Sequence, residues 1–122
     1  MASGPLAGTR ILEFTQIIAG PFGCQFLADL GAEVIKVEPP EGEPWRLSAQ
    51  FVPLESKTYQ SLNRGKRSLA IDLADERAQA AIHALVPTVD AVVINFEGML
   101  GSPPRPVGDR AEREPSRPPR SR

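Results

Sequence analysis

Four short segments of this 122-residue chain could bind a ligand, because each follows a run of residues that predicts a β-strand. They are residues 15–20, 38–40, 71–74 and 95–96. In open parallel sheets, ligands bind outside the carboxyl ends of the strands. Pro21 suits the first turn of a helix, and the N–H groups at the start of that helix could receive anionic groups. This pattern indicates a ligand site at one edge of a sheet.

A basic cluster at residues 64–67, Arg-Gly-Lys-Arg, is a second candidate, because its cations could bind phosphate groups. The cluster precedes a predicted strand and therefore lies at the amino end of that strand, away from the expected ligand edge. Pairing with nearby acids or a place on the surface is the favoured interpretation, and phosphate contact is the alternative.

Nucleophilic and metal chemistry have little support. The single cysteine, Cys24, lies beside the apolar residues of the first predicted helix, where a small buried thiol is the usual role. We expect His83 on the polar side of a later helix. One cysteine and one histidine make no metal site, and one cysteine makes no internal disulfide, which fits a reducing compartment.

The elements that position these segments alternate between strands and helices. Strands are predicted at residues 10–14, 34–37, 68–72 and 90–95. A helix from Pro21 to a left-handed position at Gly31 carries an apolar stripe of Phe22, Phe26, Leu27 and Leu30. A second helix starts near Asp75 and Glu76, ends at Pro87, and carries the stripe Ala78, Ala81, Ile82, Leu85 and Val86. The alternation predicts an α/β fold with a mostly parallel sheet covered on both faces.

The composition argues against nucleic-acid binding, membrane spanning and secretion. The formal net charge of −1 argues against nucleic acid as a partner, and no apolar run approaches the roughly 20 residues that span a membrane. The first residues lack a signal-peptide pattern. We expect a single cytoplasmic domain, with mitochondria or peroxisomes as alternative locations.

The composition changes after Phe96. Residues 97–122 hold six arginines and six prolines, and their few apolar residues do not recur at the spacing of a helix or a strand. Such a segment buries too little apolar surface to offset its ordering entropy, so we predict a disordered tail. A shifted reading frame, a truncation or an alternative transcript end would produce this tail, and a genuine flexible tail is the alternative.

Three blocks of sequence resemble the amino-terminal part of one known family. They are LADLGAEVIKVEPPEG, LNRGKRSLAIDL and DAVVINF, in that order along residues 5 to 96. The family is the class III CoA-transferases, which include formyl-CoA and carnitine CoA-transferases and the α-methylacyl-CoA racemases. The resemblance implies a Rossmann-like fold, truncated here, in which residues 1–96 form the CoA-binding part.

The resemblance also implies which residues contact CoA. Carried over position by position, they are Ile18, Pro39, Ile71, Asp72, Leu73, Asn95 and Phe96. Two positions depart from some family members, which have a basic residue where this chain has Pro39 and a glutamine where it has Ile18. Taken without the resemblance, Ile71 and Leu73 could be core residues and Asp72 a turn or cap residue.

By the same resemblance, CoA or acyl-CoA is a substrate and no cofactor is permanently bound. Family members transfer CoA between carboxylic acids through an aspartyl mixed anhydride, and they form interlocked homodimers. Their catalytic aspartate falls beyond the last residue here, so we expect an inactive nucleotide-binding lobe that does not interlock. A racemase fragment and a small non-catalytic binding protein are the alternatives.

A dinucleotide-binding fold is a weaker alternative. Glu38 follows Gly20 by 18 residues, close to the spacing of the acid that binds a ribose in such folds. However, residues 20–23 read Gly-Pro-Phe-Gly and not Gly-x-Gly-x-x-Gly, so the phosphate-binding turn is missing.

Overall fold

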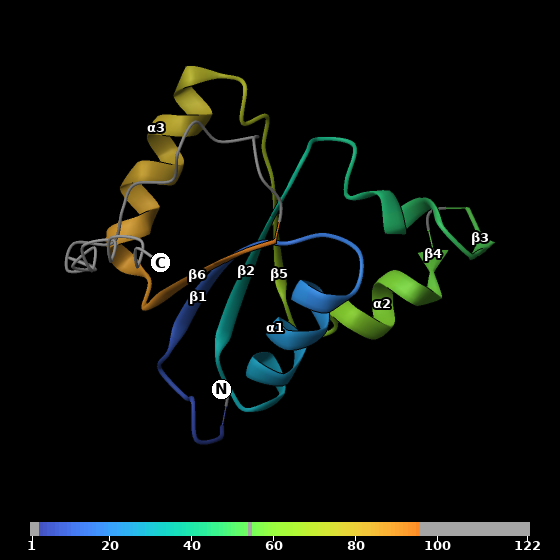
Figure 1. Ribbon diagram of the computed structural model, residues 1–122, viewed down its shortest axis with the longest axis horizontal. Helices are drawn as coiled ribbons and strands as arrows, with labels where there is room; N and C mark the ends of the chain where they lie inside the picture. Colours follow the sequence, from blue (N-terminus) through green and yellow to red (C-terminus); the bar gives the residue numbers. More distant parts are fainter. Residues whose placement is uncertain (1–2, 54, 96–122) are drawn as a thin grey trace, which may run out of the picture.

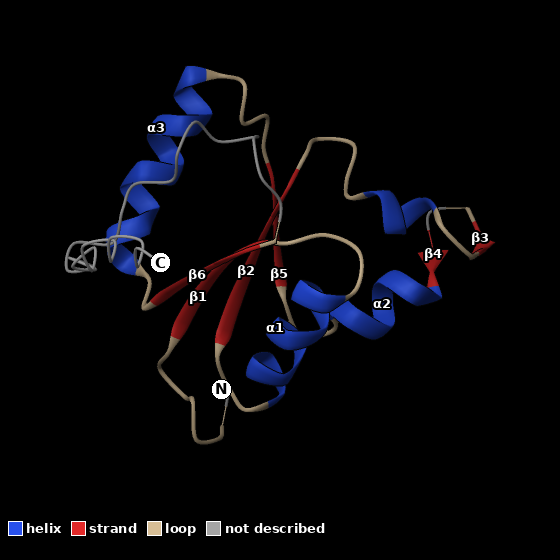
Figure 2. Cartoon of the chain, in the orientation of Figure 1, coloured by secondary structure: helices blue, strands red, loops and turns tan. Residues whose placement is uncertain are grey.

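The central element of the chain is a four-stranded parallel sheet, seen in a computed structural model that describes residues 3–53 and 55–95. Its strands are β1 (Arg10–Phe14), β2 (Glu33–Glu38), β5 (Arg67–Ala70) and β6 (Ala91–Ile94). They lie in the order β5-β2-β1-β6, and every neighbouring pair is parallel (Figure 1). The helices are α1 (Ala19–Asp29), α2 (Lys57–Asn63) and α3 (Glu76–Leu85) (Figure 2). The predicted α/β class with a parallel sheet is confirmed.

A smaller substructure joins β2 to α2. It consists of the 3-10 helix η1 (Pro44–Leu47) and the antiparallel strands β3 (Gln50–Val52) and β4 (Glu55–Ser56). A second 3-10 helix, η2 (Val86–Thr88), follows α3. In Figure 1, β3 and β4 lie beyond α2, away from the main sheet.

The helices cover opposite faces of the sheet. Ile11 of β1 packs in one core cluster with Cys24 of α1, whereas Leu12 packs in a second cluster with Ile82 of α3. Successive side chains of a strand point to opposite faces, so α1 and α3 lie on opposite sides, as Figure 1 shows. The strand order reverses between β1 and β6, which makes their carboxyl ends the topological switch point.

Of the expected apolar stripe of α1, Leu27 packs against the core, whereas the other three residues point away from it. Phe22, Phe26 and Leu30 are 49%, 54% and 44% exposed, whereas Pro21, Cys24 and Gln25 are buried. Residues at spacings of three and four share one helix face, and this chain packs the face with the smaller side chains against the sheet. Pro21 in the first turn and the positive φ of Gly31 (+101°) are as predicted. The prediction was therefore right for the end of α1, two residues late for its start at Ala19, and wrong for most of its buried face.

The second predicted helix is confirmed as α3. The side chain of Asp75 accepts a hydrogen bond from the N–H of Arg77 and caps the helix, and Ala78 and Ile82 are buried. Ala81, predicted on the same stripe, is exposed. Two strands are shorter than predicted: β5 ends at Ala70, and β6 begins one residue after Asp90. The predicted tail at 97–122 lies outside the described residues.

Candidate functional site

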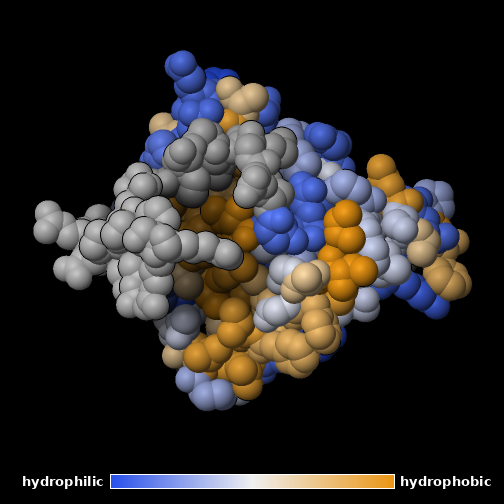
Figure 3. All heavy atoms as spheres, in the orientation of Figure 1, coloured by the Kyte–Doolittle hydropathy of each residue, from blue (hydrophilic) through white to orange (hydrophobic). Residues whose placement is uncertain are grey.

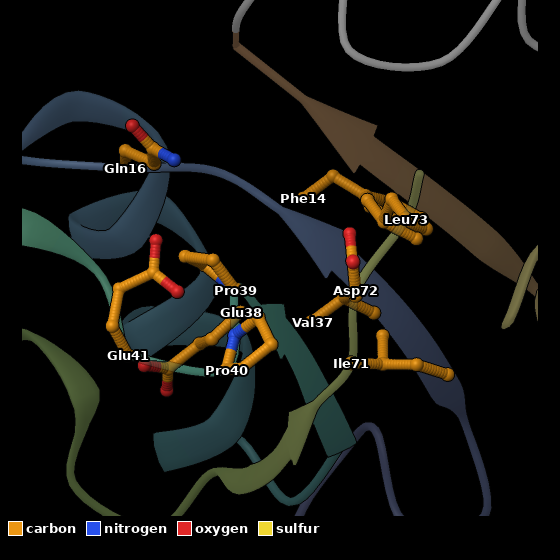
Figure 4. A pocket seen from close by; sticks show the side chains of 10 residues that line it. All are labelled: Phe14, Gln16, Val37, Glu38, Pro39, Pro40, Glu41, Ile71, Asp72 and Leu73. Carbon is orange, nitrogen blue, oxygen red and sulfur yellow. The ribbon is translucent and has the colours of Figure 1, made fainter. Parts of the chain in front are cut away.

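A cavity of about 310 Å³ opens at the carboxyl ends of β1, β2 and β5. This is the edge where the sequence predicted a ligand. Figure 4 shows the side chains around it, which come from three strand ends and the loops that follow them. The lining residues are Phe14, Gln16, Val37, Glu38, Pro39, Pro40, Glu41, Ile71, Asp72 and Leu73.

The walls of the cavity are mainly apolar, with polar groups at a few positions. The cavity borders the core cluster shared with α3, which includes Phe14 and against which Ile71 and Leu73 pack. Gln16 supplies an amide, and Asp72 and Glu41 supply carboxylates. An apolar site with a few polar groups is typical of small-molecule binding.

Glu38 ends β2 and its carboxylate is fully engaged by the protein. Arg46 donates from Nε to Oε2 (2.6 Å) and from Nη2 to Oε1 (2.8 Å), and the Tyr59 hydroxyl donates to Oε1 at 2.6 Å. Ser68 adds a hydrogen bond of 3.0 Å. Burial alone would raise the pKa of Glu38, but the bonds from Arg46, Tyr59 and the backbone N–H of Glu43 outweigh it and lower the pKa to about 2. With these contacts made, Glu38 is not available to bind a ribose, which argues against the dinucleotide alternative.

The loop after β1 is tied to the end of β6. The backbone N–H of Gln16 donates to Asn95 Oδ1 (3.0 Å), and Asn95 Nδ2 donates to the carbonyl of Gln16 (2.9 Å). This reciprocal pair spans the switch point of the sheet. Ile17, the next residue, has φ +70°, an uncommon conformation for a β-branched residue.

The structure brings most of the sequence-predicted contact residues to one place. Pro39, Ile71, Asp72 and Leu73 line the cavity. Asn95 reaches it indirectly, through its bonds to Gln16. Ile18 precedes α1, is 52% exposed and does not line the cavity. Phe96 lies outside the described residues.

The basic cluster pairs with acids, as the favoured interpretation expected. Arg64 lies 2.6 Å from Asp29, Lys66 lies 2.9 Å from Glu13, and Arg67 lies 2.6 Å from Glu33. None of these three cations is among the residues that line the cavity. All three cations are therefore paired with acids.

Sequence reasoning missed a buried ionic cluster beneath α1. Glu13, Lys36 and Glu43 are each at most 1% exposed, and Lys66 joins them. Lys36 Nζ lies 3.1 Å from Glu13 Oε1 and 2.7 Å from Glu43 Oε2. A signal was present, because a lysine between Ile35 and Val37 in a buried parallel strand needs an acidic partner.

Cys24 has the role expected of it. It is 1% exposed, and burial, together with the charge of Glu13, raises the pKa of its thiol to about 11. His83 is exposed on α3, also as expected. Across residues 3–53 and 55–95, no cluster of three or more His, Cys, Asp or Glu could hold a metal ion, and no helix has the length and apolarity to cross a membrane.

Comparison with known proteins points to one family. The family model described as CoA-transferase family III matches residues 6–100. The succinate–glutarate CoA-transferase of Agrobacterium fabrum is 43% identical over 101 residues, which cover 76% of this chain and 25% of that protein. The human succinyl-CoA:glutarate CoA-transferase is 44% identical over 94 residues, which cover 75% of this chain and 22% of that protein.

Solved structures agree in fold. A crystal structure of a Mycobacterium tuberculosis protein matches with a TM-score of 0.71 and 43% identity, over 79% of this chain and 26% of that one. A CAIB/BAIF family protein from Brucella suis matches with a TM-score of 0.70 and 40% identity, over 76% of this chain and 26% of that one. The chain thus spans about a quarter of the length of these relatives. With the family model covering residues 6–100, the chain belongs to CoA-transferase family III.

Proposed function

We propose that this chain is a nucleotide-binding lobe of a CoA-transferase and binds the adenosine end of CoA or acyl-CoA in the cavity at the carboxyl ends of β1, β2 and β5. The observation that carries the proposal is the location of that cavity. Four of the seven residues that the family resemblance assigns to CoA contact line it: Pro39, Ile71, Asp72 and Leu73. They come from two loops that lie far apart in the sequence and meet only in the fold.

The chemistry of the lining suits a nucleoside. Apolar walls that include Pro39, Ile71 and Leu73 would contact the faces of an adenine ring. The Gln16 amide and the Asp72 carboxylate would serve the polar edges of the base and the hydroxyls of the ribose. Within residues 3–53 and 55–95, the lining contains carboxylates and no lysine or arginine, so we place the phosphates of CoA outside the cavity.

For the parent enzyme we propose CoA transfer between carboxylic acids. The two relatives compared above are named for CoA transfer, which favours a transferase over a racemase. By the family resemblance, the whole enzyme would act through an aspartyl mixed anhydride and as a homodimer. The 122-residue chain spans about a quarter of such a protein, and we propose that residues 1–96 alone bind CoA without transferring it.

Isothermal titration of CoA and acetyl-CoA into the purified chain tests this proposal, with circular dichroism to confirm folding. We expect micromolar binding that Asp72→Ala and Asn95→Ala each weaken. Asp29→Ala is the matched control, because Asp29 pairs with Arg64 on the surface and does not line the cavity. A folded chain that binds neither compound would contradict the proposal.

A further inference from the structure

One wall of the cavity is a loop that ends in a buried acid. Pro39, Pro40 and Glu41 line the cavity and belong to the connection between β2 and η1. The connection ends at Glu43, which is only 1% exposed. Its Oε2 lies 2.7 Å from Nζ of Lys36, which is as deeply buried. The exposed wall is therefore anchored at its far end inside the protein.

Lys36 also joins this loop to the segment that follows β1. Its ammonium donates to the backbone carbonyl of Thr15 (2.8 Å) and to Glu13 Oε1 (3.1 Å). Thr15 directly precedes Gln16, another lining residue. One buried ammonium thus links the segment after β1 to the loop after β2.

Backbone contacts give the loop a defined shape between its anchors. The N–H of Gly42 donates to the carbonyl of Pro39 (2.8 Å), and the N–H of Glu43 donates to Glu38 Oε2 (3.2 Å). The N–H of Arg46 then donates to the carbonyl of Glu43 (3.0 Å). Two of these bonds are made by the backbone of Glu43 and the third by its neighbour Gly42.

A buried ion pair adds little net stability compared with apolar packing, but in some proteins it selects one arrangement of the groups that it joins. We propose that Glu43, through its ion pair with Lys36, is a positioning residue that sets the wall formed by residues 39–41 for nucleotide binding. This inference rests on the function proposed above. It extends that function to residues that do not line the cavity.

The test compares three forms of the full chain. Glu43→Gln keeps the side-chain size and removes the charge that pairs with Lys36. Lys66→Met is the control, since Lys66 is also buried and ion-paired with Glu13 but contacts the Pro21 carbonyl and not the loop. Each substitution leaves one unbalanced charge in the buried cluster of two acids and two lysines, so their effects on stability should be comparable.

Two readouts separate positioning from stability. In Glu43→Gln, we expect amide hydrogen exchange at Gly42 and Arg46 to speed up and the Kd for CoA to rise roughly tenfold, because the ligand must then order at least one loop residue. Exchange within β1 should not change. In Lys66→Met, we expect the Kd to stay within about threefold of the wild-type value, since Lys66 bonds to Glu13 and the Pro21 carbonyl and not to the loop.

The remaining outcomes are also decisive. If Glu43→Gln does not fold, the double variant Lys36→Met/Glu43→Gln is used in its place. The double variant also lacks the ion pair between residues 36 and 43, and the charges of Glu13 and Lys66 still balance each other. The inference would be overturned if the variant without the pair had the same amide exchange and the same Kd for CoA as the wild-type chain. It would also be overturned if Lys66→Met weakened CoA binding as much as Glu43→Gln does. If the wild-type chain does not bind CoA, the proposed function fails by itself. In that case, amide hydrogen exchange at Gly42 and Arg46 still tests whether Glu43 anchors the loop. Unchanged exchange in the variant would refute the anchoring role.

Discussion

Replacing Glu38 by glutamine should remove much of the chain's sensitivity to acid. In the folded protein, Glu38 accepts hydrogen bonds from Arg46, Tyr59 and Ser68, and these bonds join β2, η1, α2 and β5. Glu38→Gln has the same shape but cannot carry the charge that Arg46 faces. Arg46, which also stacks over the Tyr59 ring with its guanidinium carbon 3.9 Å from the ring centre, would lose its ionic partner.

The pKa of Glu38 sets the size of the effect. A fall from the usual 4.5 to about 2 corresponds to roughly 3 kcal/mol of stability. Because the folded state has the lower pKa, this stability is fully present above pH 4.5 and is lost as the pH falls to about 2. At pH 7, Glu38→Gln should therefore lower the free energy of unfolding by roughly 3 kcal/mol.

Urea unfolding at a series of pH values measures this directly. Between pH 5 and 2 the wild-type chain should lose stability more steeply than Glu38→Gln, and the two curves should converge at the acid end. Hydrogen bonds from Arg10 and Arg67 lower the pKa of Glu33 in both proteins, so the difference between the curves isolates Glu38. Glu41→Gln, on the exposed part of the same loop, should change stability by no more than about 0.5 kcal/mol. Parallel curves for wild type and Glu38→Gln would refute this reasoning.

Four other results are expected. CoA and dephospho-CoA should bind with Kd values within about threefold of each other, because none of the described residues that line the cavity is a cation for the 3′-phosphate, and a large preference for CoA in calorimetry would contradict this. Gly31→Ala should cost roughly 1–2 kcal/mol in chemical unfolding, since Gly31 has φ +101°. Gly23→Ala, where an added Cβ meets nothing within 4 Å, should instead stabilise α1 by about 0.5–1 kcal/mol. The thiol of Cys24 should react with a thiol reagent only after unfolding, because it is 1% exposed and its pKa is raised to about 11, and fast labelling of the folded chain would show otherwise.

Local signals in the sequence predicted the main elements well. Pro21 and Gly31 marked the ends of α1, the pair Pro39 and Pro40 marked the end of β2, and Asp75 marked the start of α3. Such signals depend on backbone conformation within a few residues, which neighbouring residues decide. The rule that ligands bind at the carboxyl ends of parallel strands then located the cavity edge.

Properties that depend on distant partners were not predicted. The apolar spacing of Phe22 and Phe26 indicated the core face of α1, but the sheet surface beneath that helix carries buried charges and accepts the face with Cys24 and Gln25. The role of Glu43 was missed for a similar reason. Nothing near it in sequence shows that a buried lysine seven residues earlier will meet it.

The position of bound nucleotide tests the central claim most directly. In a heteronuclear NMR titration of the labelled chain with CoA, the account predicts shifts of the amide signals of Gln16, Glu41 and Asp72, which line the cavity. The amides of Glu33 and Arg67, paired at the amino ends of their strands, should not move. Shifts centred on Glu33 and Arg67, or no saturable shifts at all, would contradict a nucleotide site at the carboxyl edge of the sheet.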